Sequence, residues 1–574
     1  MPRANDVVER LLLEYAELLS IVSEDRFKAR AYEKAARAVG GFSTDVDGLD
    51  VKGMMRIPSV GRSIAEKVDT YLRSGSFPEL EELRAKIPAG VRELMAIPGM
   101  GPKKAVTLYD HLGIDSVEAL TAAVDRDEIA ALKGFGAKTQ DNIRKGLQQV
   151  RSSTGRVQLP VAFDVAERLL AELSAMRGVR RAAFAGSLRR MVETIGDVDL
   201  LVASRDAAPI MEAFVSAPGV SRVLAHGDRK SSILDERGLQ VDLRVVPIEA
   251  WGAAMIYFTG SKAHNVRIRE IAVRKGLKLN EYGLFVAESG ELLAAETEEA
   301  VYERLGMTFI PPTLREDRGE VQAALDGSLP SVIQQRQIRG DLHTHTNLTD
   351  GLAPLDEMVA AGAAAGYAYY AVTDHAPNLF MQRMTEDKML AQRERVRALQ
   401  RRYPKMTLLH GTELNIDPDG GVDWDDEFLA GFDVTVASVH SHWNLPREQQ
   451  TRRIVRAMEN SRVHVIGHLT GRRIGSRPPL DLDVDEVFAA AARTGTALEI
   501  NSHPDRLDLR DEHVIRARRH GVRFAVDTDA HAPVHLPNLR FGVGTAQRGG
   551  VTKDDVINAW PLARLRRFLA DKAR

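Results

Sequence analysis

The chain has 574 residues, of which 44% are hydrophobic and 28% charged, and its formal net charge is -2. This length predicts several domains, about three to five, and the near-zero charge limits any nucleic-acid contact to local basic patches. The chain has no cysteine, which excludes disulfide scaffolds, thiolate zinc sites, iron–sulfur clusters and a cysteine nucleophile, and no apolar stretch reaches the roughly 18 residues that span a membrane. We therefore expect a cytoplasmic protein without a membrane partner.

Residues 1–150 place apolar side chains at helical spacing, and a glycine-containing turn pattern recurs in them three times. The copies lie at 57–61, 97–101 and 132–136. A tight glycine turn before a helix presents backbone N–H groups that hold a phosphate without reading bases. The pattern resembles the helix-hairpin-helix motif of DNA-binding proteins, which implies DNA contacts by the backbone of Gly61, Gly99, Gly101, Gly134 and Gly136. The alternative is three plain helix–helix turns with glycine C-caps.

Residues 151–250 alternate short apolar strands with helices, which predicts an α+β domain with a mixed or antiparallel sheet. Asp197 and Asp199 are two apart on a predicted strand, so both carboxylates point to one face of the sheet. Asp242 opens a second apolar run and can supply a third carboxylate from a neighbouring strand. Three convergent carboxylates suit two Mg²⁺ ions that assist an in-line phosphoryl transfer.

The turn just upstream of these aspartates has the chemistry of a phosphate site. Gly186 and Ser187 end a predicted strand and begin a helix, where backbone N–H groups and a hydroxyl can hold a triphosphate. Arg190 adds a cation at the same turn. Residues 262–278 form a further basic patch suited to a phosphate backbone.

The run from Gly186 to Val202, with Tyr257-Phe258-Thr259-Gly260-Ser261 downstream, resembles the nucleotidyltransferase palm of family X DNA polymerases. The resemblance implies a DNA-directed DNA polymerase that fills short gaps in DNA repair. It uses Mg²⁺ or Mn²⁺, dNTPs and gapped or primer–template DNA. The catalytic, metal-binding residues implied are Asp197, Asp199 and Asp242. The nucleotide-binding residues implied are Gly186, Ser187, Arg190, Gly196, Tyr257, Phe258, Gly260 and Asn265, and Arg269 would contact the template minor groove.

One residue departs from the family pattern, and the N-terminal segment leaves two functions open. Gln240 stands two residues before Asp242, where family members often carry Arg, and this bears on the rate rather than on the reaction type. Segments 27–32 and 60–67 resemble the small lyase domain of the family, in which a lysine at the position of Lys67 forms a Schiff base. We expect this domain, including Lys67, to grip DNA, with lyase activity as the alternative.

Residues 339–574 alternate short strands and helices, and they hold 13 of the 16 histidines. Histidines and carboxylates end almost every predicted strand, which is typical of a β/α barrel with its active site at the strand C-termini. Imidazole and carboxylate ligands without thiolates suit Mn²⁺, Zn²⁺ or iron. The predicted strands are 368–373, 407–410, 434–439, 463–467, 497–501 and 522–527.

The ordered ligand residues of this half resemble the PHP (polymerase and histidinol phosphatase) domain of bacterial family X polymerases. The resemblance implies three divalent metals, Mn²⁺ or Zn²⁺, which lower the pKa of water and support phosphodiester hydrolysis. It also implies a 3′–5′ exonuclease, with abasic-site cleavage or 3′-phosphate removal as further activities. The first metal would bind His343, His345, Glu413 and Asp529, the second Glu413, His440 and His468, and the third Asp350, His375 and His531.

Six other barrel residues carry weaker expectations. Asp374 would orient a metal ligand, and Arg472 and Arg506 would bind the substrate phosphate. His464, together with His442 and His503, lies outside the implied ligand set, and we expect structural or substrate-contact roles for the three.

We therefore expect a multidomain, monomeric chain with helical helix-hairpin-helix domains, an α+β nucleotidyltransferase palm and thumb, and a distorted β/α barrel. The expected boundaries are 1–85 for the lyase-like domain, 86–150 for a fingers-like domain, 151–250 for the palm, 251–318 for the thumb, 319–338 for a linker and 339–574 for the PHP barrel. Two alternatives remain open: the barrel acts on small phosphate esters, or the whole chain is chiefly a DNA-end binding module with weak catalysis.

Overall fold

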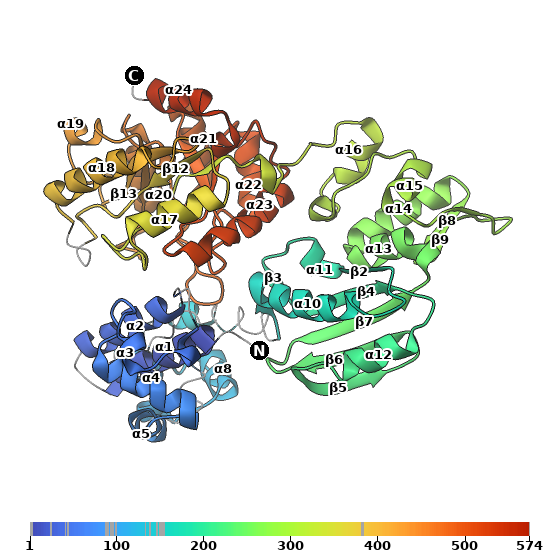
Figure 1. Ribbon diagram of the computed structural model, residues 1–574, viewed down its shortest axis with the longest axis horizontal. Coiled ribbons are helices and arrows are strands. Elements are labelled where there is room, and N and C mark those ends of the chain that lie inside the picture. The colour runs from blue at the N-terminus through green and yellow to red at the C-terminus, as the bar shows by residue number, and fades with distance from the viewer. Residues whose placement is uncertain are drawn as a thin grey trace.

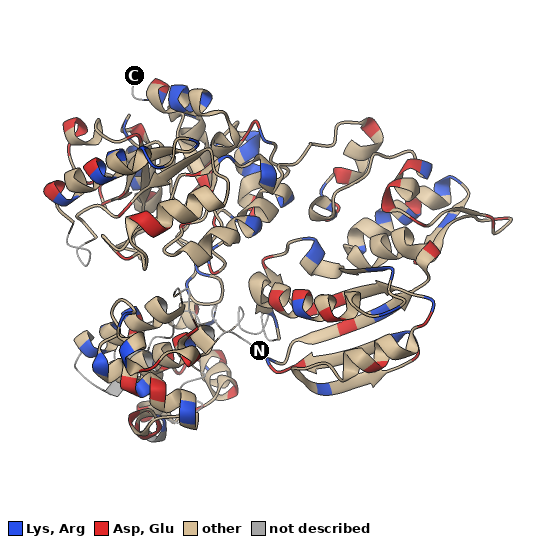
Figure 2. Cartoon of the chain, viewed as in Figure 1, with Lys and Arg blue, Asp and Glu red and all other residues tan. Residues whose placement is uncertain are grey.

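The computed structural model describes residues 4–22, 26–40, 42, 45–86, 91, 94, 97, 100, 102–132, 134–136, 139–144, 147, 155–379 and 384–572. Figure 1 shows the N-terminal helices, the palm with the thumb, and the barrel as separate bodies beside one another. Acidic and basic residues alternate along all of them (Figure 2), and the net charge of the chain is -2. No described helix is long and apolar enough to cross a membrane.

The N-terminal segment is helical, as predicted. Its helices share one apolar cluster that extends from Val8 to Leu147, so the two expected N-terminal domains pack together. The described helices are α1 (Ala4–Val22), α2 (Arg26–Gly40), α3 (Val51–Met54), α4 (Arg62–Ser74), α5 (Pro78–Lys86), α7 (Pro102–Leu112) and α8 (Val117–Asp125).

The palm is built on a five-stranded mixed sheet of order β2-β4-β7-β6-β5. β4 and β7 run parallel, and the other neighbours are antiparallel. The larger strands are β2 (Arg181–Phe184), β4 (Asp197–Ala203), β5 (Val220–His226), β6 (Lys230–Asp235) and β7 (Gln240–Val246), and β1 (Val157–Gln158) pairs with β3 (Thr194–Ile195). The helices are α10 (Leu159–Ser174), α11 (Gly186–Arg189) and α12 (Ala208–Val215).

The thumb follows the palm and extends further than expected. Its elements are α13 (Trp251–Thr259), α14 (Lys262–Arg274), β8 (Leu277–Asn280), β9 (Gly283–Val286), β10 (Leu292–Ala294), α15 (Glu298–Arg304) and α16 (Glu320–Asp326). The expected linker 319–338 is wrong for its first half, because Val321 and Ala324 of α16 lie in the apolar core of the thumb. This helix was not predicted because its seven residues are too few to show a clear helical spacing of apolar residues.

The C-terminal half is a nearly closed parallel barrel. Its seven strands pair in chain order, and an isolated parallel bridge between Thr344 and Ala530 spans the remaining gap. The strands are β11 (Gly340–Asp341), β12 (Tyr369–Val372), β13 (Thr407–Asn415), β14 (Val434–Ser438), β15 (Val465–Ile466), β16 (Ala497–Asn501) and β17 (Phe524–Asp527). All six predicted strand positions are confirmed.

Helices surround the barrel and close one of its ends. They are α17 (Leu355–Ala364), α18 (Glu386–Gln400), α19 (Asp426–Leu429), α20 (Arg447–Glu459), α21 (Val484–Thr494), α22 (Asp511–Arg519), α23 (Leu539–Arg548) and α24 (Leu562–Lys572). Leu565 and Leu569 of α24 share an apolar cluster with residues at the strand starts, including Val434 and Val465. The carboxyl ends of the strands are therefore the end at which polar ligands can gather.

Candidate active sites in the palm and the barrel

The palm carboxylates lie on the parallel pair β4 and β7. Asp199 is in register with Asp242, and Asp197 is in register with Gln240. Burial, with the charges of Asp197 and Asp242, raises the pKa of Asp199 to about 7. The two neighbouring strands thus bring three acids together, as predicted. Because their negative charges repel one another, bound cations would stabilise the group.

Gly186 makes room for one of these acids. Its φ is +60°, and a Cβ atom built on it would lie 2.3 Å from Oδ2 of Asp199. Gly186 directly follows the residue after β2 and begins α11, as the strand–helix junction predicted. Any side chain here would displace the Asp199 carboxylate, so the glycine is required by close approach and by backbone conformation.

Asp242 is held by two groups from its own sheet. Nε2 of Gln240 donates to Oδ1 of Asp242 over 2.9 Å, and Nζ of Lys230 on β6 lies 3.7 Å from Oδ2. Gln240 occupies the position that departs from the family pattern. The amide of Gln240 on β7 and the ammonium group of Lys230 on β6 therefore orient the Asp242 carboxylate.

Arg190 is committed to protein partners. Its Nη1 donates to the backbone oxygen of Thr259 over 2.7 Å, and its Nε donates to Oε1 of Glu316 over 3.0 Å. Arg190 therefore joins the turn after Gly186 to the thumb beside Gly260, whose added Cβ would lie 3.3 Å from Arg190 Nη1. Sequence proximity to Gly186 and Ser187 gave no sign of this link.

Two thumb residues expected at the nucleotide, Tyr257 and Asn265, line one small pocket. Arg269, expected at the template minor groove, lines it as well, together with Asn280. Nδ2 of Asn265 donates to the backbone oxygen of Tyr257 over 2.7 Å, and Nε of Arg269 donates to that of Asn265 over 3.1 Å. Phe258 lies outside this pocket, edge-on to Tyr257 at 5.0 Å between ring centroids.

The N-terminal glycines are described in part. Gly61 is the N-cap of α4, which is the geometry that presents backbone N–H groups. Gly134 has a φ of +91°, and the carbonyl of Gly136 accepts from the N–H groups of residues 139 and 140 at the start of a helical turn. Gly99 and Gly101 lie outside the described residues. Gly196 of the palm packs against Arg156, because a Cβ atom added to Gly196 would lie 3.0 Å from Nη1 of Arg156.

Lys67 lies on α4 in a largely enclosed position. Its side chain is 15% exposed, and its ammonium group is ion-paired with Glu79. The ammonium also lies 5.7 Å from the centroid of the Phe77 ring. The ammonium group is therefore engaged by Glu79 rather than free to attack a sugar, which agrees with the expected DNA-gripping role more than with lyase activity.

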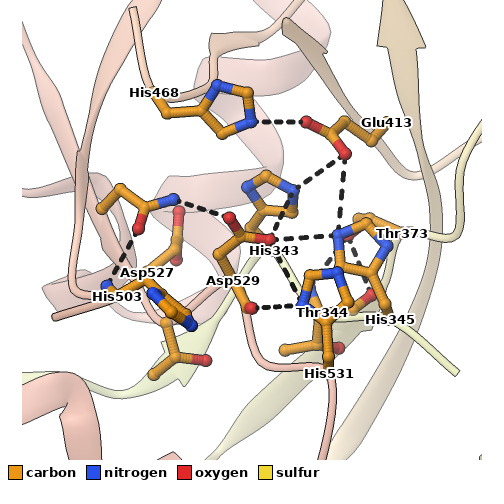
Figure 3. A network of polar contacts seen from close by, with 12 residues as sticks. His343, Thr344, His345, Thr373, Glu413, His468, His503, Asp527, Asp529 and His531 are labelled. Carbon is orange, nitrogen blue, oxygen red and sulfur yellow. Dashed lines mark hydrogen bonds and ion pairs between the residues drawn. The ribbon is translucent and has the colours of Figure 1, made fainter. Parts of the chain in front are cut away.

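Nine imidazole and carboxylate side chains converge beyond the carboxyl ends of the barrel strands. Figure 3 shows His343, His345 and Asp529 pointing toward one another, with Glu413 and His468 above them. All nine belong to the predicted ligand set, which is His343, His345, Asp350, His375, Glu413, His440, His468, Asp529 and His531. The strands deliver these residues from seven places in the sequence to one end of the barrel.

Glu413 lies at the centre of this cluster. Its Oε1 is 3.0 Å from Nε2 of His468 and 3.2 Å from Nε2 of His440. Its Oε2 is 2.9 Å from Nδ1 of His375 and 3.5 Å from Nε2 of His343. Burial opposes the charge of Glu413, but the neighbouring imidazoles of His440, His343 and His375 outweigh it and hold its pKa well below the usual value.

The ligand atoms fall into three groups with spacings of a metal site. Within each group the atoms lie no more than 4.8 Å apart: His343, His345 and Asp529; His345, Asp350, His375 and His531; and His375, Glu413 and His440. The first holds three of the four ligands expected for the first metal and lacks Glu413. The second holds the three ligands expected for the third metal, with His345 added. The last group has His375 where His468 was expected, although His468 remains 3.0 Å from Glu413.

The cluster has the chemistry that divalent metals require. Nε2 of His343 and both ring nitrogens of His345 are buried without a hydrogen-bond partner among the described residues. Burying such nitrogens is costly unless another ligand takes them up. Lone pairs of imidazole beside carboxylates are a donor set for Mn²⁺ or Zn²⁺, so the residues fit the implied metals.

Residues outside the predicted set hold the ligands in place. Oε1 of Glu499 lies 2.7 Å from Nδ1 of His343, and its Oε2 accepts from the backbone N–H of His468. The side-chain oxygen of Asn415 lies 2.8 Å from Nδ1 of His440. The carboxylate of Asp374 accepts from Thr346 and Gln392, so it braces the loop after His345. Its backbone oxygen accepts from the N–H of the ligand Glu413 over 3.2 Å. An acid within the apolar strand 497–501 was the signal that could have revealed Glu499.

We expect Glu499→Gln to weaken metal binding at the barrel by about 10- to 100-fold, because the amide no longer matches the charge that orients His343. Titration of the metal-free protein with Mn²⁺, followed by calorimetry, measures this change. Excess Mn²⁺ should restore most of the nuclease rate. A variant whose affinity stays within twofold of wild type would show that Glu499 does not position His343.

His464 is structural, as expected. Its Nδ1 accepts from the backbone N–H of Thr435 over 3.1 Å, which requires an unprotonated nitrogen. Burial, together with Lys572 and Arg462, lowers the pKa of His464 to about 4. His442 is exposed beside Ser441, and His503 pairs with Asp505 at the rim of the ligand cluster.

The low pKa of His464 predicts an acid-sensitive barrel. The unfolded chain takes up a proton near pH 6.5, whereas folded His464 does so only near its depressed pKa, so stability falls as the pH drops between these values. The loss reaches about 3 kcal/mol at pH 4. Urea unfolding at pH 7 and pH 5 measures it. His464→Asn should flatten the pH dependence, and an equal dependence in both proteins would contradict this assignment.

Family models match most parts of the chain. They are the DNA polymerase beta thumb over residues 254–316, a helix-hairpin-helix domain over 3–77, a SAM-like helix-hairpin-helix tandem over 91–149 and the PHP domain over 341–503.

Curated relatives cover the whole chain and its parts. The "DNA polymerase/3'-5' exonuclease PolX" of Bacillus subtilis is 34% identical over 98% of both chains. DNA polymerase lambda of Rattus norvegicus is 27% identical over 51% of this chain and 53% of its own. A probable phosphatase of Thermoanaerobacter is 26% identical over 41% of this chain and 95% of its own. With the palm and barrel sites described above, the end-to-end match shows that the chain belongs to the family X DNA polymerases that carry a C-terminal PHP domain.

Proposed function

We propose that the chain is a DNA-directed DNA polymerase that fills short gaps during DNA repair, and that its barrel is a metal-dependent 3′–5′ exonuclease. The observation that carries this proposal is the presence of both acid and imidazole ligand sets, intact, in one chain that aligns with the Bacillus subtilis protein over 98% of its length. The same proposal places the protein in the cytoplasm, as a monomer.

In the palm, the reaction joins the primer 3′ oxygen to the α-phosphorus of a dNTP and releases pyrophosphate. Asp197, Asp199 and Asp242 would hold Mg²⁺ or Mn²⁺, which neutralises the triphosphate and acidifies the primer hydroxyl. Gln240 and Lys230 orient Asp242, 2.9 Å and 3.7 Å from its oxygens. The backbone of Gly186, with the Ser187 hydroxyl, would face the triphosphate at the start of α11.

The thumb would select the nucleotide. Tyr257 is 38% exposed at the end of α13, where its ring can meet the sugar of the incoming nucleotide. Asn265 and Arg269 line the pocket beside it. The nucleotide-binding roles of Phe258, Gly196 and Gly260, and the DNA contacts of the N-terminal glycines, are part of the same proposal.

In the barrel, water attacks a phosphodiester at the 3′ end of a strand, and the bond from phosphorus to the 3′ oxygen breaks. The nine ligands would hold three Mn²⁺ or Zn²⁺ ions, which supply an ionised water at neutral pH. Glu499 and Asn415 fix the orientation of His343 and His440. Their hydrogen bonds also set which ring nitrogen of each histidine faces the cluster.

One observation favours a second function for the barrel. Its match to a probable phosphatase raises hydrolysis of small phosphate monoesters as the competing activity. The test supplies the full chain and Mn²⁺ with a 5′-labelled oligonucleotide and with a small phosphomonoester in separate reactions. We expect stepwise shortening of the oligonucleotide at a far higher kcat/KM. Hydrolysis of the monoester alone would favour the phosphatase.

A gap-filling test addresses the palm separately. A labelled primer is placed upstream of a one-nucleotide gap, a five-nucleotide gap or an open template. We expect the highest kcat/KM at the gaps, because the N-terminal helices would grip the downstream end. Equal extension on all three substrates would contradict gap filling, and binding without extension would leave only an end-binding module.

A further inference from the structure

A cavity of about 230 Å³ lies over the ligand cluster of the barrel. Its lining includes metal-ligand candidates such as Glu413 and His440. The lining also carries an indole and three guanidinium groups, from Trp443, Arg473, Arg477 and Arg506, which we call the wall, and the carboxylate of Asp505. Three guanidinium groups beside the candidate metal ligands suit a substrate with more than one phosphate.

Arg506 lies deepest in this wall. Its side chain is 13% exposed, and its Nε is 3.6 Å from Oδ2 of Asp529. Its Nη1 is buried and has no hydrogen-bond partner within the part of the chain that the structure describes. An unsatisfied guanidinium nitrogen facing a cavity is costly unless an anion enters.

Arg477 is crowded by like charges. Its guanidinium lies 4.0 Å from the centroid of a Trp443 ring, and its Nε donates to the backbone oxygen of Gly471 over 2.7 Å. Burial, with the nearby cations of Arg506 and Arg473, lowers the pKa of Arg477 to about 10, against the opposing effect of Asp505 and Asp508. Asp505 also faces the wall, with its Oδ2 3.5 Å from Nε of Arg473, so the acids offset part of this positive charge.

Arg473 and Arg477 belong to a hairpin, residues 472–477, that reaches the palm. The N–H groups of both arginines donate to each other's carbonyl oxygens over 2.9 Å, which closes the hairpin. Its tip, Ile474, packs against the apolar core of the palm. Nε2 of Gln158 on β1 donates to the backbone oxygen of Ile474 over 3.2 Å.

The base of the hairpin is fixed to the palm as well. Nη2 of Arg472 donates to Oε2 of Glu193 over 2.7 Å and to the backbone oxygen of Leu507 over 2.6 Å. Leu507 and Phe541 of the barrel lie, almost fully buried, in the palm core cluster. Arg472 is thus a docking residue through its Nη2, and it is not among the residues that line the cavity. Its expected contact with the substrate phosphate stays a prediction.

We propose that hairpin 472–477, with Arg506, is the strand-binding wall of the nuclease site, that it takes the backbone phosphates next to the scissile one, and that the palm holds it in place. The inference rests on the proposed exonuclease function. It makes the polymerase palm part of the nuclease: without the docked palm, the metal ligands remain but the arginines lose their support. Its substrate class is a nucleic-acid strand rather than a single phosphate.

The test uses the full chain with Mn²⁺, a 5′-labelled single-stranded oligonucleotide and bis(p-nitrophenyl) phosphate, a diester that needs no strand-binding wall. Arg477→Gln should raise KM for the oligonucleotide about tenfold, which corresponds to one lost phosphate contact. It should also reduce the slope of log KM against log salt by about 0.7. Ile474→Ala keeps every charge and should raise the same KM about threefold by loosening the hairpin. Arg493→Gln, on the exposed side of α21, is the control, and it should leave the KM for both substrates unchanged.

Outcomes separate the inference from the function on which it rests. Selective loss on the oligonucleotide, with a reduced salt slope, supports the strand-binding wall. In a second outcome, the wild-type protein shortens DNA while the variants keep the wild-type KM, or while their activity on both substrates falls in proportion. Either result overturns the proposed strand-binding wall and leaves the proposed exonuclease intact. Wild type that hydrolyses the small diester and never shortens DNA overturns the proposed exonuclease and the wall together.

Discussion

Replacing Asp197 with alanine should reduce nucleotide addition by at least about 10³-fold, a loss of about 4 kcal/mol in transition-state stabilisation. Asp197 and Asp199 share one face of β4, and Asp199 is in register with Asp242. Removing one of three convergent carboxylates removes a ligand for the cations that the triphosphate needs. Rapid-quench measurement of single-nucleotide addition to a gapped primer gives the rate of this step directly.

The matched control for this variant is Asp206→Ala. Asp206 is an exposed acid beyond the end of β4, so its loss changes the net charge equally without touching the site. We expect its addition rate to stay within twofold of wild type. Addition by Asp197→Ala within tenfold of wild type would show that the palm acids do not carry the polymerase reaction.

Replacing His343 with alanine should reduce strand shortening by about 10²- to 10³-fold. His343 is fully buried, its Nε2 lies 3.5 Å from Glu413 and 3.6 Å from Asp529, and its Nδ1 is fixed by Glu499. The variant loses an imidazole between three acids, so it should bind less metal. The rate of loss of full-length 5′-labelled strand measures activity, and elemental analysis measures metal content.

His520→Ala is the control for the barrel. His520 is exposed at the end of α22 and is not among the residues that line the cavity over the ligand cluster, so its removal should leave both the shortening rate and the metal content near wild-type values. If His343→Ala kept its metal and shortened DNA at the wild-type rate, the ligand cluster would not be the nuclease site. A folded variant is verified by an unchanged rate of nucleotide addition.

The sequence predicted most of the chemistry because strand periodicity and strand ends are local signals. Alternate positions placed Asp197 and Asp199 on one face, and ligands after successive barrel strands converged as the barrel geometry requires. The mixed palm sheet and the strand–helix junction at Gly186 were predicted for the same reason.

What sequence reasoning missed depends on contacts between distant segments. Arg472 and Glu193 are 279 residues apart, and Arg548 and Glu316 are 232 apart, so no local pattern announces their ion pairs. Arg190 was assigned by proximity to the glycine turn, whereas the structure pairs it with Glu316.

Short elements and supporting hydrogen bonds were missed for a related reason. The helix α16 is too brief for its periodicity to stand out, yet it completes the thumb core. Glu499 faces His343 from β16, a relation that only the closed barrel creates. In each case tertiary packing decided a role that residue type alone left open.

We expect the one chain to hold two separate active sites, one in the palm and one in the barrel. A 5′-labelled primer at a short gap, incubated with Mn²⁺ with and without dNTPs, tests it on wild type, Asp197→Ala and His343→Ala in one experiment. We expect that Asp197→Ala shortens but does not extend the primer, and that His343→Ala extends but does not shorten it. Loss of both activities in either variant, or shortening that survives His343→Ala, would contradict it.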